Sequence, residues 1–487
     1  MNYLEFLRLV FPEAHVTATA LIVLALGVAK PGARGLQTGV ALGGLAFAIV
    51  AVLRLPLNAA LPNGVLVITP LTSLFKIICL VLAMFTVLIS RADRALTRNS
   101  SEHIAVVLLA TVGLLLLVGS EELLMIFIGL ELTGLSLYVL TAFDKTDIRS
   151  AEAGMKYFLF GSTASAFTLF GFSLIYGMAG STTLSGIAQK FDGAPVAPLL
   201  AAGVVMSLIG FAFKLAAAPF HLWAPDTYQG APISSAAFIA SGSKVASFFV
   251  AGKILLVGFA PLHGSAAWHA MLAGWTPLIA ALAALSIVIG NFTALVQTNV
   301  RRLLAYSAVA HAGYTLLGLV AGGRDGFSAT LFYTTIYALT LLGAFAVTGF
   351  VRRTTGGDDL KNFRGLSARS PLLAGCMCVF MLSLAGLPPL AGFFGKFYLF
   401  AATFRAGENH GLLWLIVLAL FGSLVSLYYY LIVLKAVFGA ADTRVTTSDE
   451  PGADWLQRAT IAVLAIAVVG LGILPGILVE RIIAALV

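Results

Sequence analysis

The sequence is poor in charge and almost free of cysteine. Only 10% of its 487 residues are Asp, Glu, Lys or Arg, whereas 60% are hydrophobic. So little charge excludes an ordinary soluble domain, in which about 25% of residues are charged. Cys79, Cys376 and Cys378 lie in apolar segments without the CxxC or Cys/His spacing of a zinc or iron–sulfur site. We therefore expect these cysteines to be packing residues.

Motifs for redox cofactors and for metals are also missing. No G-x-G-x-x-G follows a predicted strand, and no pair of histidines is placed as axial haem ligands. We therefore expect neither a cofactor nor a metal in this chain. The net charge of +8 does not indicate nucleic-acid binding, because the basic residues gather in alternate loops between apolar runs, as membrane topology requires.

Apolar runs of about 20 residues recur from end to end, and each can cross a hydrocarbon core of roughly 30 Å. We predict an all-α polytopic membrane protein of about fourteen transmembrane helices. The expected spans are 7–29, 36–57, 70–90, 104–120, 122–142, 155–177, 199–229, 233–259, 276–298, 301–321, 326–351, 371–403, 411–437 and 459–485. Basic residues favour the odd-numbered loops, which places these loops in the cytoplasm and both termini outside.

Three lysines lie in the middle of expected spans. They are Lys214, Lys244 and Lys396. A charge at the centre of a membrane helix costs about 2.5 to 3.5 kcal/mol, so a functional or paired role is the default for such residues.

Three further lysines, Lys76, Lys156 and Lys253, lie closer to the ends of their spans. For these residues, snorkelling of the amine to the membrane interface is at least as good an explanation as a function.

Glu131 is the acidic residue that lies nearest to the centre of a span, and it is a candidate partner for Lys214. A carboxylate and an amine that are buried together hold each other charged, whereas each alone would be neutral. A static ion pair that only fixes helix packing is the alternative. Such a pair does not explain the further amine of Lys244, or His221 and His311 at membrane depth.

Two of the expected helices contain a break. Pro219 lacks a backbone N–H, so span 7 should open just after Lys214. The segment 386–389, with one glycine and two prolines, interrupts span 12 ahead of Lys396. Broken helices at membrane depth line hydrated paths inside protein, and a pair of them in corresponding halves is typical of inverted-repeat transporters.

We therefore expect spans 4–8 and 9–13 to form two inverted five-helix repeats, with helices 7 and 12 broken. Glu131 precedes Lys214 by 83 residues, and His311 precedes Lys396 by 85, so the second repeat would use histidine where the first uses glutamate. The expected units are an N-terminal unit 1–103, a first repeat 104–260, a second repeat 270–440 and a C-terminal span 455–487.

Seven segments together resemble the antiporter-like subunits of bacterial respiratory complex I, the proton-pumping NADH:quinone oxidoreductase. They are GLELTGLSLYVL, AGMKYFLFGS, FKLAAAPFHLWAPDTYQGAP, SGSKVASF, RRLLAYSAVAHAGY, DLKNFRGLSARSP and MLSLAGLPPLAGFFGKFYLF. The length and Lys396 make the chain similar to the subunit N group. The larger sister subunit carries additional spans and a lateral helix, and the other sister has glutamate at the position of Lys396.

The resemblance implies proton translocation driven by quinone reduction in partner subunits. In the family, the counterparts of Glu131 and Lys214 form a switchable pair, that of Lys244 links two half-channels, and that of Lys396 faces the exit. Lys156 and His221 match secondary relay positions, and we add His311 to this secondary set.

The resemblance also implies the surroundings of the chain. Flavin, iron–sulfur clusters and quinone would be bound by partner subunits, and the partners would include a neighbouring antiporter-like subunit and membrane lipids, with no nucleic acid. The location would be the bacterial inner (plasma) membrane, with both termini periplasmic. A subunit of a multisubunit sodium/proton antiporter is an alternative, because it shares the broken helices and buried lysines. A structural membrane spacer with a fixed ion pair is another.

Overall fold

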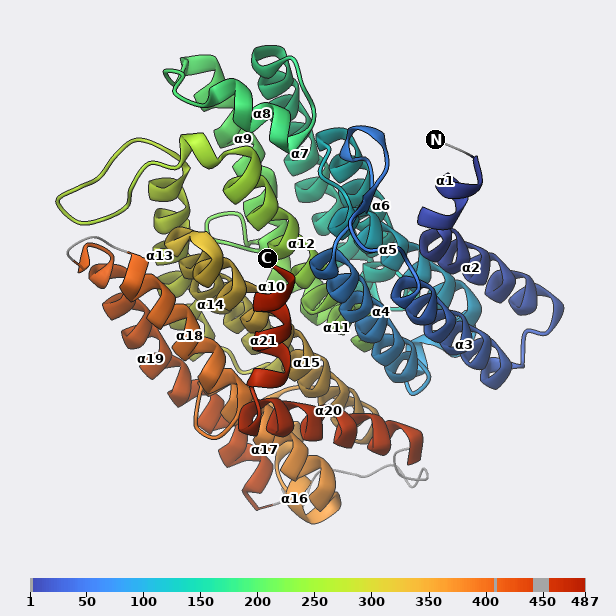
Figure 1. The fold of residues 1–487 in the computed structure, drawn as a ribbon. Coiled ribbons are helices and arrows are strands. Elements are labelled where there is room, and N and C mark those ends of the chain that lie inside the picture. The colour runs from blue at the N-terminus through green and yellow to red at the C-terminus, as the bar shows by residue number, and fades with distance from the viewer. Residues whose placement is uncertain (1–2, 407–409, 441–454, 487) are drawn as a thin grey trace.

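The computed structural model describes residues 3–406, 410–440 and 455–486, which are almost entirely helical (Figure 1). Helices are expected here because a backbone in a bilayer must satisfy its own N–H and C=O groups. In the described ranges, thirteen helical segments are long and apolar enough to cross a membrane. A multi-pass membrane protein is therefore confirmed.

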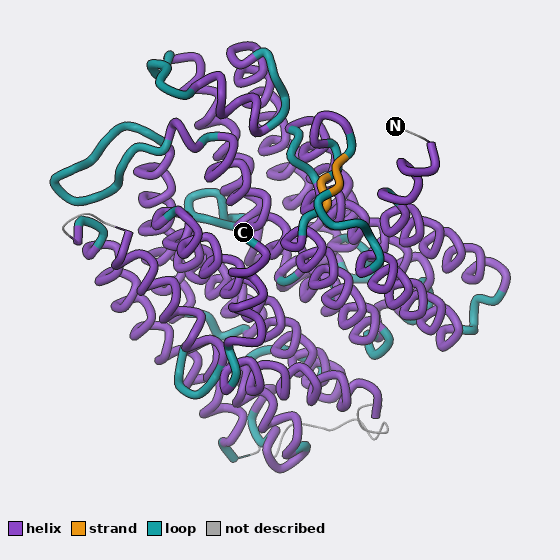
Figure 2. Tube along the Cα trace, viewed as in Figure 1, coloured by secondary structure: helices purple, strands orange, loops and turns teal. Residues whose placement is uncertain are grey.

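The N-terminal helices form one flank of the molecule, opposite α18 and α19 in Figure 1. Their bounds are α1 (Tyr3–Leu9), α2 (Phe11–Ala29), α3 (Arg34–Leu53) and α4 (Pro70–Ser90), followed by η2 (Arg94–Leu96). The connection between α3 and α4 holds η1 (Pro62–Gly64) and the antiparallel hairpin of β1 (Ala59–Ala60) and β2 (Val67–Ile68), which is orange in Figure 2.

The central part of the chain continues with long helices and several short ones. Their bounds are α5 (Ser100–Gly119), α6 (Leu123–Thr141), α7 (Ile148–Ala179), α8 (Leu184–Phe191), α9 (Pro198–Leu215), α10 (Trp223–Gly230), α11 (Ile233–Ala240), α12 (Gly242–Lys253), η3 (Ile254–Gly258) and η4 (Ala260–Leu262). The break between α11 and α12 falls at Ser241 and has no counterpart among the sequence predictions.

The C-terminal part surrounds one long helix. The bounds are α13 (Trp275–Leu295), α14 (Val300–Ala321), α15 (Gly323–Thr355), η5 (Leu360–Phe363), α16 (Leu366–Arg369), α17 (Pro371–Ala385), α18 (Ala391–Ala406), α19 (Leu413–Phe438), α20 (Trp455–Ile473) and α21 (Gly476–Ala485). Helix α15 packs against α11, α12, α14, α17, α18 and α20, so it joins the central and C-terminal parts.

The first predicted break is present between α9 and α10. The chain leaves α9 through Ala216, which adopts a left-handed conformation with φ of 54°. The N–H of Ala217 then donates to the carbonyl of Ala212 at 2.8 Å, which is the hydrogen bond of a Schellman turn. Because this turn ends the helix three residues ahead of Pro219, the proline follows the break and does not cause it.

The second predicted break lies between α17 and α18 and begins with the same turn. Gly386 is left-handed with φ of 85°, and the N–H of Leu387 donates to the carbonyl of Leu382 at 3.1 Å. The expected span 371–403 is thus built from α17 and α18, and neither reaches the length of a single crossing. The last expected span, 459–485, is likewise divided into α20 and α21.

Candidate functional site

Lys214 is a buried amine at the end of the first arm of a broken helix. It lies in the last turn of α9, and its Nζ has no hydrogen-bond partner among the described residues. The amine lies 5.7 Å from the centre of the Tyr138 ring on α6. A Cβ on Gly134 of the same helix would come within 2.7 Å of Nζ. Helix α6 therefore passes close to the amine at Gly134, where a larger side chain would push the flexible lysine end aside.

Glu131 lies one turn before Gly134 on α6 and is partly exposed at the side of the helix bundle. Its carboxylate accepts a hydrogen bond of 2.5 Å from Ser165 of α7. It is close enough to act electrostatically on Lys214, but in the part of the chain that the structure describes no ion pair joins the two side chains. The two side chains are thus apart in this structure, and a serine holds the carboxylate.

His221 lies in the turn between α9 and α10. Its side chain is buried, and within the described ranges its Nδ1 has no hydrogen-bond partner. Its ring lies 6.4 Å from that of Tyr306 on α14. In the same turn, the N–H of Ala218 donates to the hydroxyl of Ser286 on α13 at 2.8 Å. The first break therefore contacts α13 and α14, which belong to the other half of the chain.

Lys244 connects the same two halves. It lies in the first turn of α12 and is buried, and its Nζ donates to the carbonyl of Ala308 on α14 at 2.9 Å. The amine also lies 5.6 Å from the centre of the Tyr337 ring on α15.

His311 lies one turn further along α14 than Ala308, and both of its ring nitrogens have partners. Nδ1 is 2.6 Å from the hydroxyl of Tyr333, and Nε2 is 2.9 Å from that of Tyr430. The hydroxyl of Tyr430 in turn contacts Ser307. Because a hydroxyl can both donate and accept, this arrangement suits either tautomer of the imidazole.

Lys396 is the buried amine of the second broken helix. Its Nζ donates to the carbonyl of Ala385 at 3.0 Å and to the hydroxyl of Ser423 at 2.9 Å. Ala385 is the last residue of α17, so the cation lies at a helix C-terminus, where positive charge is favourable. The ring centre of Tyr314 lies 5.1 Å away.

Sequence reasoning missed the polar groups that surround these residues. Ser165, Ser423, Tyr333 and Tyr430 bond the predicted residues directly, as described above. Asn291 adds a further link, since its amide donates to the hydroxyl of Tyr314 at 2.9 Å. No signal in a single sequence distinguishes these serines and tyrosines from ordinary packing residues in apolar runs.

The snorkelling interpretation of Lys76 and Lys253 is wrong. Lys76 is 1% exposed and lies 2.6 Å from Glu13 of α2. Lys253 is also buried, lies 2.9 Å from Glu121 and donates to the carbonyl of Ser120 at 3.1 Å. Each amine is held inside the protein because a carboxylate from another segment meets it there, which satisfies the charge without an exit to the interface.

Lys156 differs from the other predicted site residues because its side chain is 40% exposed. It is ion-paired with both Glu152 and Asp226, at 2.7 Å in each case. Asp226 lies on α10, so Lys156 connects α7 to the second arm of the first broken helix. Glu152 and Asp226 border a polar cavity of about 700 Å³ where several odd-numbered loops meet.

Asp358 is the most enclosed carboxylate of this cavity. Burial by itself raises the pKa of Asp358, but the charge of Arg301, the amide of Asn299 and the charge of Arg352 outweigh burial and hold the pKa below its ordinary value. Across the described residues, no group of three or more His, Cys, Asp or Glu side chains is arranged to hold a metal ion.

Comparison with known proteins identifies the family. Residues 120–426 match the family described as "NADH:quinone oxidoreductase/Mrp antiporter, TM". NADH-quinone oxidoreductase subunit N 2 of Acidobacterium capsulatum is 45% identical over 494 aligned residues, which cover 98% of each chain. The chain belongs to the subunit N family of NADH-quinone oxidoreductase. A member of this family is an antiporter-like subunit of the membrane arm of complex I, so the resemblance predicted from the seven segments is confirmed.

Solved structures agree with this family. A chain of respiratory complex I from Thermus thermophilus with bound aureothin aligns with a TM-score of 0.78 at 35% identity, covering 96% of this chain and 98% of that chain. A chain of the Mrp complex from Dietzia sp. DQ12-45-1b aligns with a TM-score of 0.83 at 20% identity, covering 99% of this chain and 97% of that one. The second match shows a shared fold alone. As a member of the subunit N family, the chain is a subunit of NADH:quinone oxidoreductase and part of the complex I assembly.

Proposed function

We propose that this chain relays protons across the bacterial plasma membrane, driven by quinone reduction elsewhere in complex I. The residues of the relay are Glu131, Lys214, Lys244 and Lys396, with Lys156, His221 and His311 as secondary groups. The observation that carries the proposal is the buried Lys214 amine, which lacks a hydrogen-bond partner among the described residues while a carboxylate stands nearby on α6. A buried cation without a partner lowers the stability of the fold, so its presence inside a membrane span favours a functional role.

The two positions of Glu131 would control the proton on Lys214. When the carboxylate turns toward the amine, it favours the ammonium form, so Lys214 takes up a proton. When the carboxylate is held by Ser165, as it is here, the amine is left in a low dielectric and releases its proton. His221, in the turn just beyond Lys214, has a ring nitrogen that no described residue contacts by a hydrogen bond, and this nitrogen can receive or supply that proton.

The second half would continue the relay through α14. Lys244 bonds the carbonyl of Ala308, and His311 lies one turn further along the same helix. From His311, the hydroxyls of Tyr333 and Tyr430 extend the polar contacts within the second half. Lys396, beside the second break, would be the last station.

The architecture that supports this relay is a pair of inverted five-helix repeats within fourteen transmembrane spans. The matching Schellman turns at α9 and α17 support such a repeat. The first repeat would comprise residues 104–260 and the second 270–440, with the N-terminal unit 1–103 and the C-terminal span 455–487 beside them. Parts of these units, residues 1–2, 407–409, 441–454 and 487, lie outside the described residues. Both termini would be periplasmic.

The chain would depend on partner subunits for energy. Moving one charge against a membrane potential requires roughly 2.3 kcal/mol per 100 mV, and this chain is expected to carry no redox group. Flavin, iron–sulfur clusters and quinone would be bound elsewhere in the complex, and a neighbouring antiporter-like subunit and membrane lipids would contact this chain.

The test is Glu131→Ala in the intact complex, with Glu102→Ala as the control, because Glu102 is an exposed acid in the first turn of α5. We expect the Glu131 variant to assemble, with proton pumping and coupled quinone reduction reduced together by on the order of tenfold. The control should behave as wild type. Pumping would be followed with a pH-sensitive dye in membrane vesicles, and assembly by native electrophoresis.

Three results would contradict the proposal in different ways. Normal pumping by a fully assembled Glu131→Ala complex would favour the membrane spacer with a fixed ion pair. A requirement for sodium in wild-type vesicles would favour sodium/proton antiport. Loss of pumping in the Glu102→Ala control would show that the assay responds to any missing carboxylate.

A further inference from the structure

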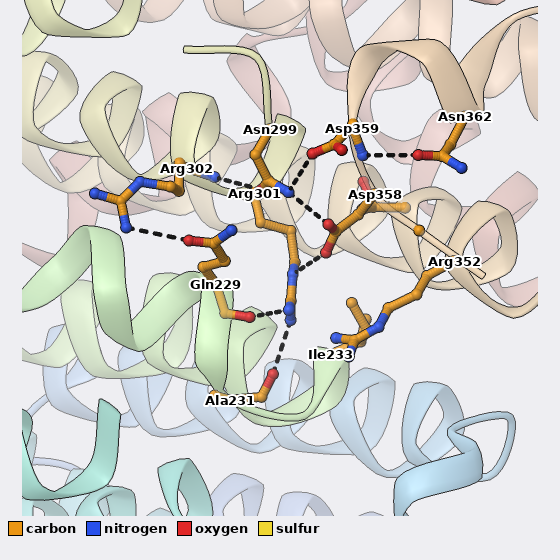
Figure 3. Close-up of polar contacts among 12 residues, drawn as sticks. Gln229, Ala231, Ile233, Asn299, Arg301, Arg302, Arg352, Asp358, Asp359 and Asn362 are labelled. Carbon is orange, nitrogen blue, oxygen red and sulfur yellow. Dashed lines mark hydrogen bonds and ion pairs between the residues drawn. The ribbon is translucent and has the colours of Figure 1, made fainter. Parts of the chain in front are cut away.

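The second arm of the first broken helix is held at its end by an arginine from the other half of the chain. Helix α10 has only eight residues, and the last carbonyls of a helix lack partners within it. Arg301, at the start of α14, donates from Nη1 to the carbonyl of Ala231 at 2.8 Å and from Nη2 to that of Gln229 (Figure 3). Its guanidinium therefore caps α10 from outside.

The same guanidinium is anchored on its other edge. Nε of Arg301 donates to Asp358 at 2.6 Å, and the second oxygen of that carboxylate accepts from the amide of Asn299 at 2.5 Å. Asp358 lies between α15 and η5, so one buried arginine connects α10, α14 and the end of α15 (Figure 3). Arg301 is 2% exposed, and a buried charge of this kind persists only when its donors are satisfied.

Arg302 makes a second, more exposed link to α10. Its Nη1 donates to Asp226 at 2.6 Å and to the side chain of Gln229 at 3.1 Å. The other oxygen of Asp226 accepts from Lys156 on α7 at 2.7 Å. Helix α10 is thus connected to both halves of the chain at the rim of the polar cavity.

A helix as short as α10 does not fix its own position, because isolated helices shorter than about 12 residues are marginal in water and depend on packing. The turn that leads into α10 carries His221, seven residues after Lys214 in the chain. A displacement of α10 would therefore move His221 relative to the buried amine. Lysine does not reproduce this arrangement, because its compact ammonium lacks the fixed, planar donors that reach two carbonyls on one side and a carboxylate on another edge.

We propose that Arg301 is a positioning residue for proton transfer: by capping α10 and binding Asp358, it sets the place of His221 relative to Lys214 and ties that place to the second half of the chain. This inference rests on the proposed proton relay. A clamp with a purely structural role would change how much complex assembles, whereas a positioning residue also changes how many protons each assembled complex moves.

The experiment compares Arg301→Lys with Arg405→Lys in the whole complex. Arg405 is an exposed arginine at the end of α18 and serves as the matched control. Protons moved per second during NADH oxidation are measured in vesicles and divided by the amount of assembled complex. We expect this ratio to fall by about twofold or more for Arg301→Lys, because small displacements of transfer groups have large effects on rate. The control should keep the wild-type ratio.

Asp358→Asn provides a second variant, because it removes the anchor and leaves the arginine in place. We expect the same ratio to fall, by a smaller factor. A wild-type ratio in both assembled variants would overturn the proposal, and failure of both variants to assemble would assign Arg301 to folding alone, which overturns it as well. Glu131→Ala is measured in parallel: normal pumping there would refute the relay itself, whereas loss of pumping there with a wild-type ratio for Arg301→Lys would refute only the positioning role.

Discussion

The two broken helices end in the same turn but treat their lysines differently. Ala216 and Gly386 are both left-handed and both follow the last residue of a first arm. Lys214, however, has no hydrogen-bond partner among the described residues, whereas Lys396 donates to Ala385 and Ser423. The same backbone turn can therefore accompany an amine without a hydrogen-bond partner among the described residues, or one that two acceptors hold.

The two breaks are also supported by different means. The first has its second arm capped by the buried guanidinium of Arg301 and linked to Arg302. The second is packed against α20, where a Cβ on Gly472 would lie 2.3 Å from the carbonyl oxygen of Pro389. Arginine–aspartate ion pairs hold the first break, whereas the second combines close packing with the hydrogen bond from Lys396. The first break is therefore the one expected to respond when a carboxylate loses its charge.

The largest effect is expected from replacing each amine by methionine. Lys214→Met and Lys396→Met should both lower pumping by on the order of tenfold or more, because each removes a proton carrier. Their effects on stability should differ in sign. Lys214→Met removes an amine that is buried without a hydrogen-bond partner among the described residues, which should stabilise the folded protein by about 1–3 kcal/mol. Lys396→Met instead leaves the carbonyl of Ala385 without its donor and should destabilise the protein by about the same amount.

Heating of the purified complex, followed by native electrophoresis, measures this difference in stability. Each variant is compared with the wild type at the same detergent and lipid content. Equal losses of stability in the two variants would show that the hydrogen bonds of Lys396 do not distinguish it from Lys214.

Lys244 tests whether the two halves act together. Lys244→Arg keeps the positive charge and a donor for the carbonyl of Ala308, but arginine does not release a proton under these conditions. We expect the complex to assemble and its coupled pumping to fall by on the order of tenfold, as measured with a pH-sensitive dye. Wild-type turnover in this variant would show that Lys244 is a structural cation.

The features that could be recognised in the sequence are residues that are energetically unfavourable inside an ordinary membrane helix. A lysine in the middle of an apolar run, such as Lys214 or Lys396, and the residues that break a helix are unfavourable unless the fold uses them. The number of apolar runs likewise indicated a multi-pass protein, although α17 and α18 are too short to have been counted by length alone.

The contacts between segments could not be read in the same way. Glu13 lies 63 residues from Lys76 in the chain, and nothing in one sequence tells which helices are neighbours. Arg301 gives a second example, since its position in an odd-numbered loop was explained by membrane topology alone. The topology rule accounts for the presence of the charge but says nothing of the two carbonyls and the carboxylate that it binds.

A smaller effect is expected at the turns themselves. Gly386→Ala forces a Cβ into the left-handed region at a cost of roughly 1–2 kcal/mol, and this Cβ would lie 2.9 Å from Cδ of Lys396. The matched change Ala216→Gly relieves about 1–2 kcal/mol of strain of that kind but gives the unfolded chain freedom worth about 0.4–1 kcal/mol, so a small net stabilisation is expected. Thermal stability of the complex measures both. Equal losses of thermal stability in the two variants would contradict the expectation that these left-handed positions favour glycine.

The smallest effect is expected from pH at the first break. The pKa of Asp358 is held below its ordinary value because the charge of Arg301 and its other partners outweigh burial. A carboxyl whose pKa is lowered by folding contributes its full stabilisation above the ordinary value of about 4 and loses it only as the pH falls through the lowered value. The clamp on α10 should therefore be unchanged from about pH 8 to about pH 5.

Hydrogen exchange, corrected for its intrinsic dependence on pH, can compare α10 with α18 over this range. We expect the protection of both helices to stay constant down to about pH 5, and α10 alone to lose protection under more acidic conditions, because Asp358 then no longer anchors Arg301. In Asp358→Asn, protection of α10 should be weaker throughout, and its acid-dependent loss should be smaller, because only Asp226 of α10, paired with Arg302 and Lys156, is then left to lose its charge. Loss of protection in α10 near neutral pH, or parallel loss in α10 and α18, would show that the charge of Asp358 does not hold the first break.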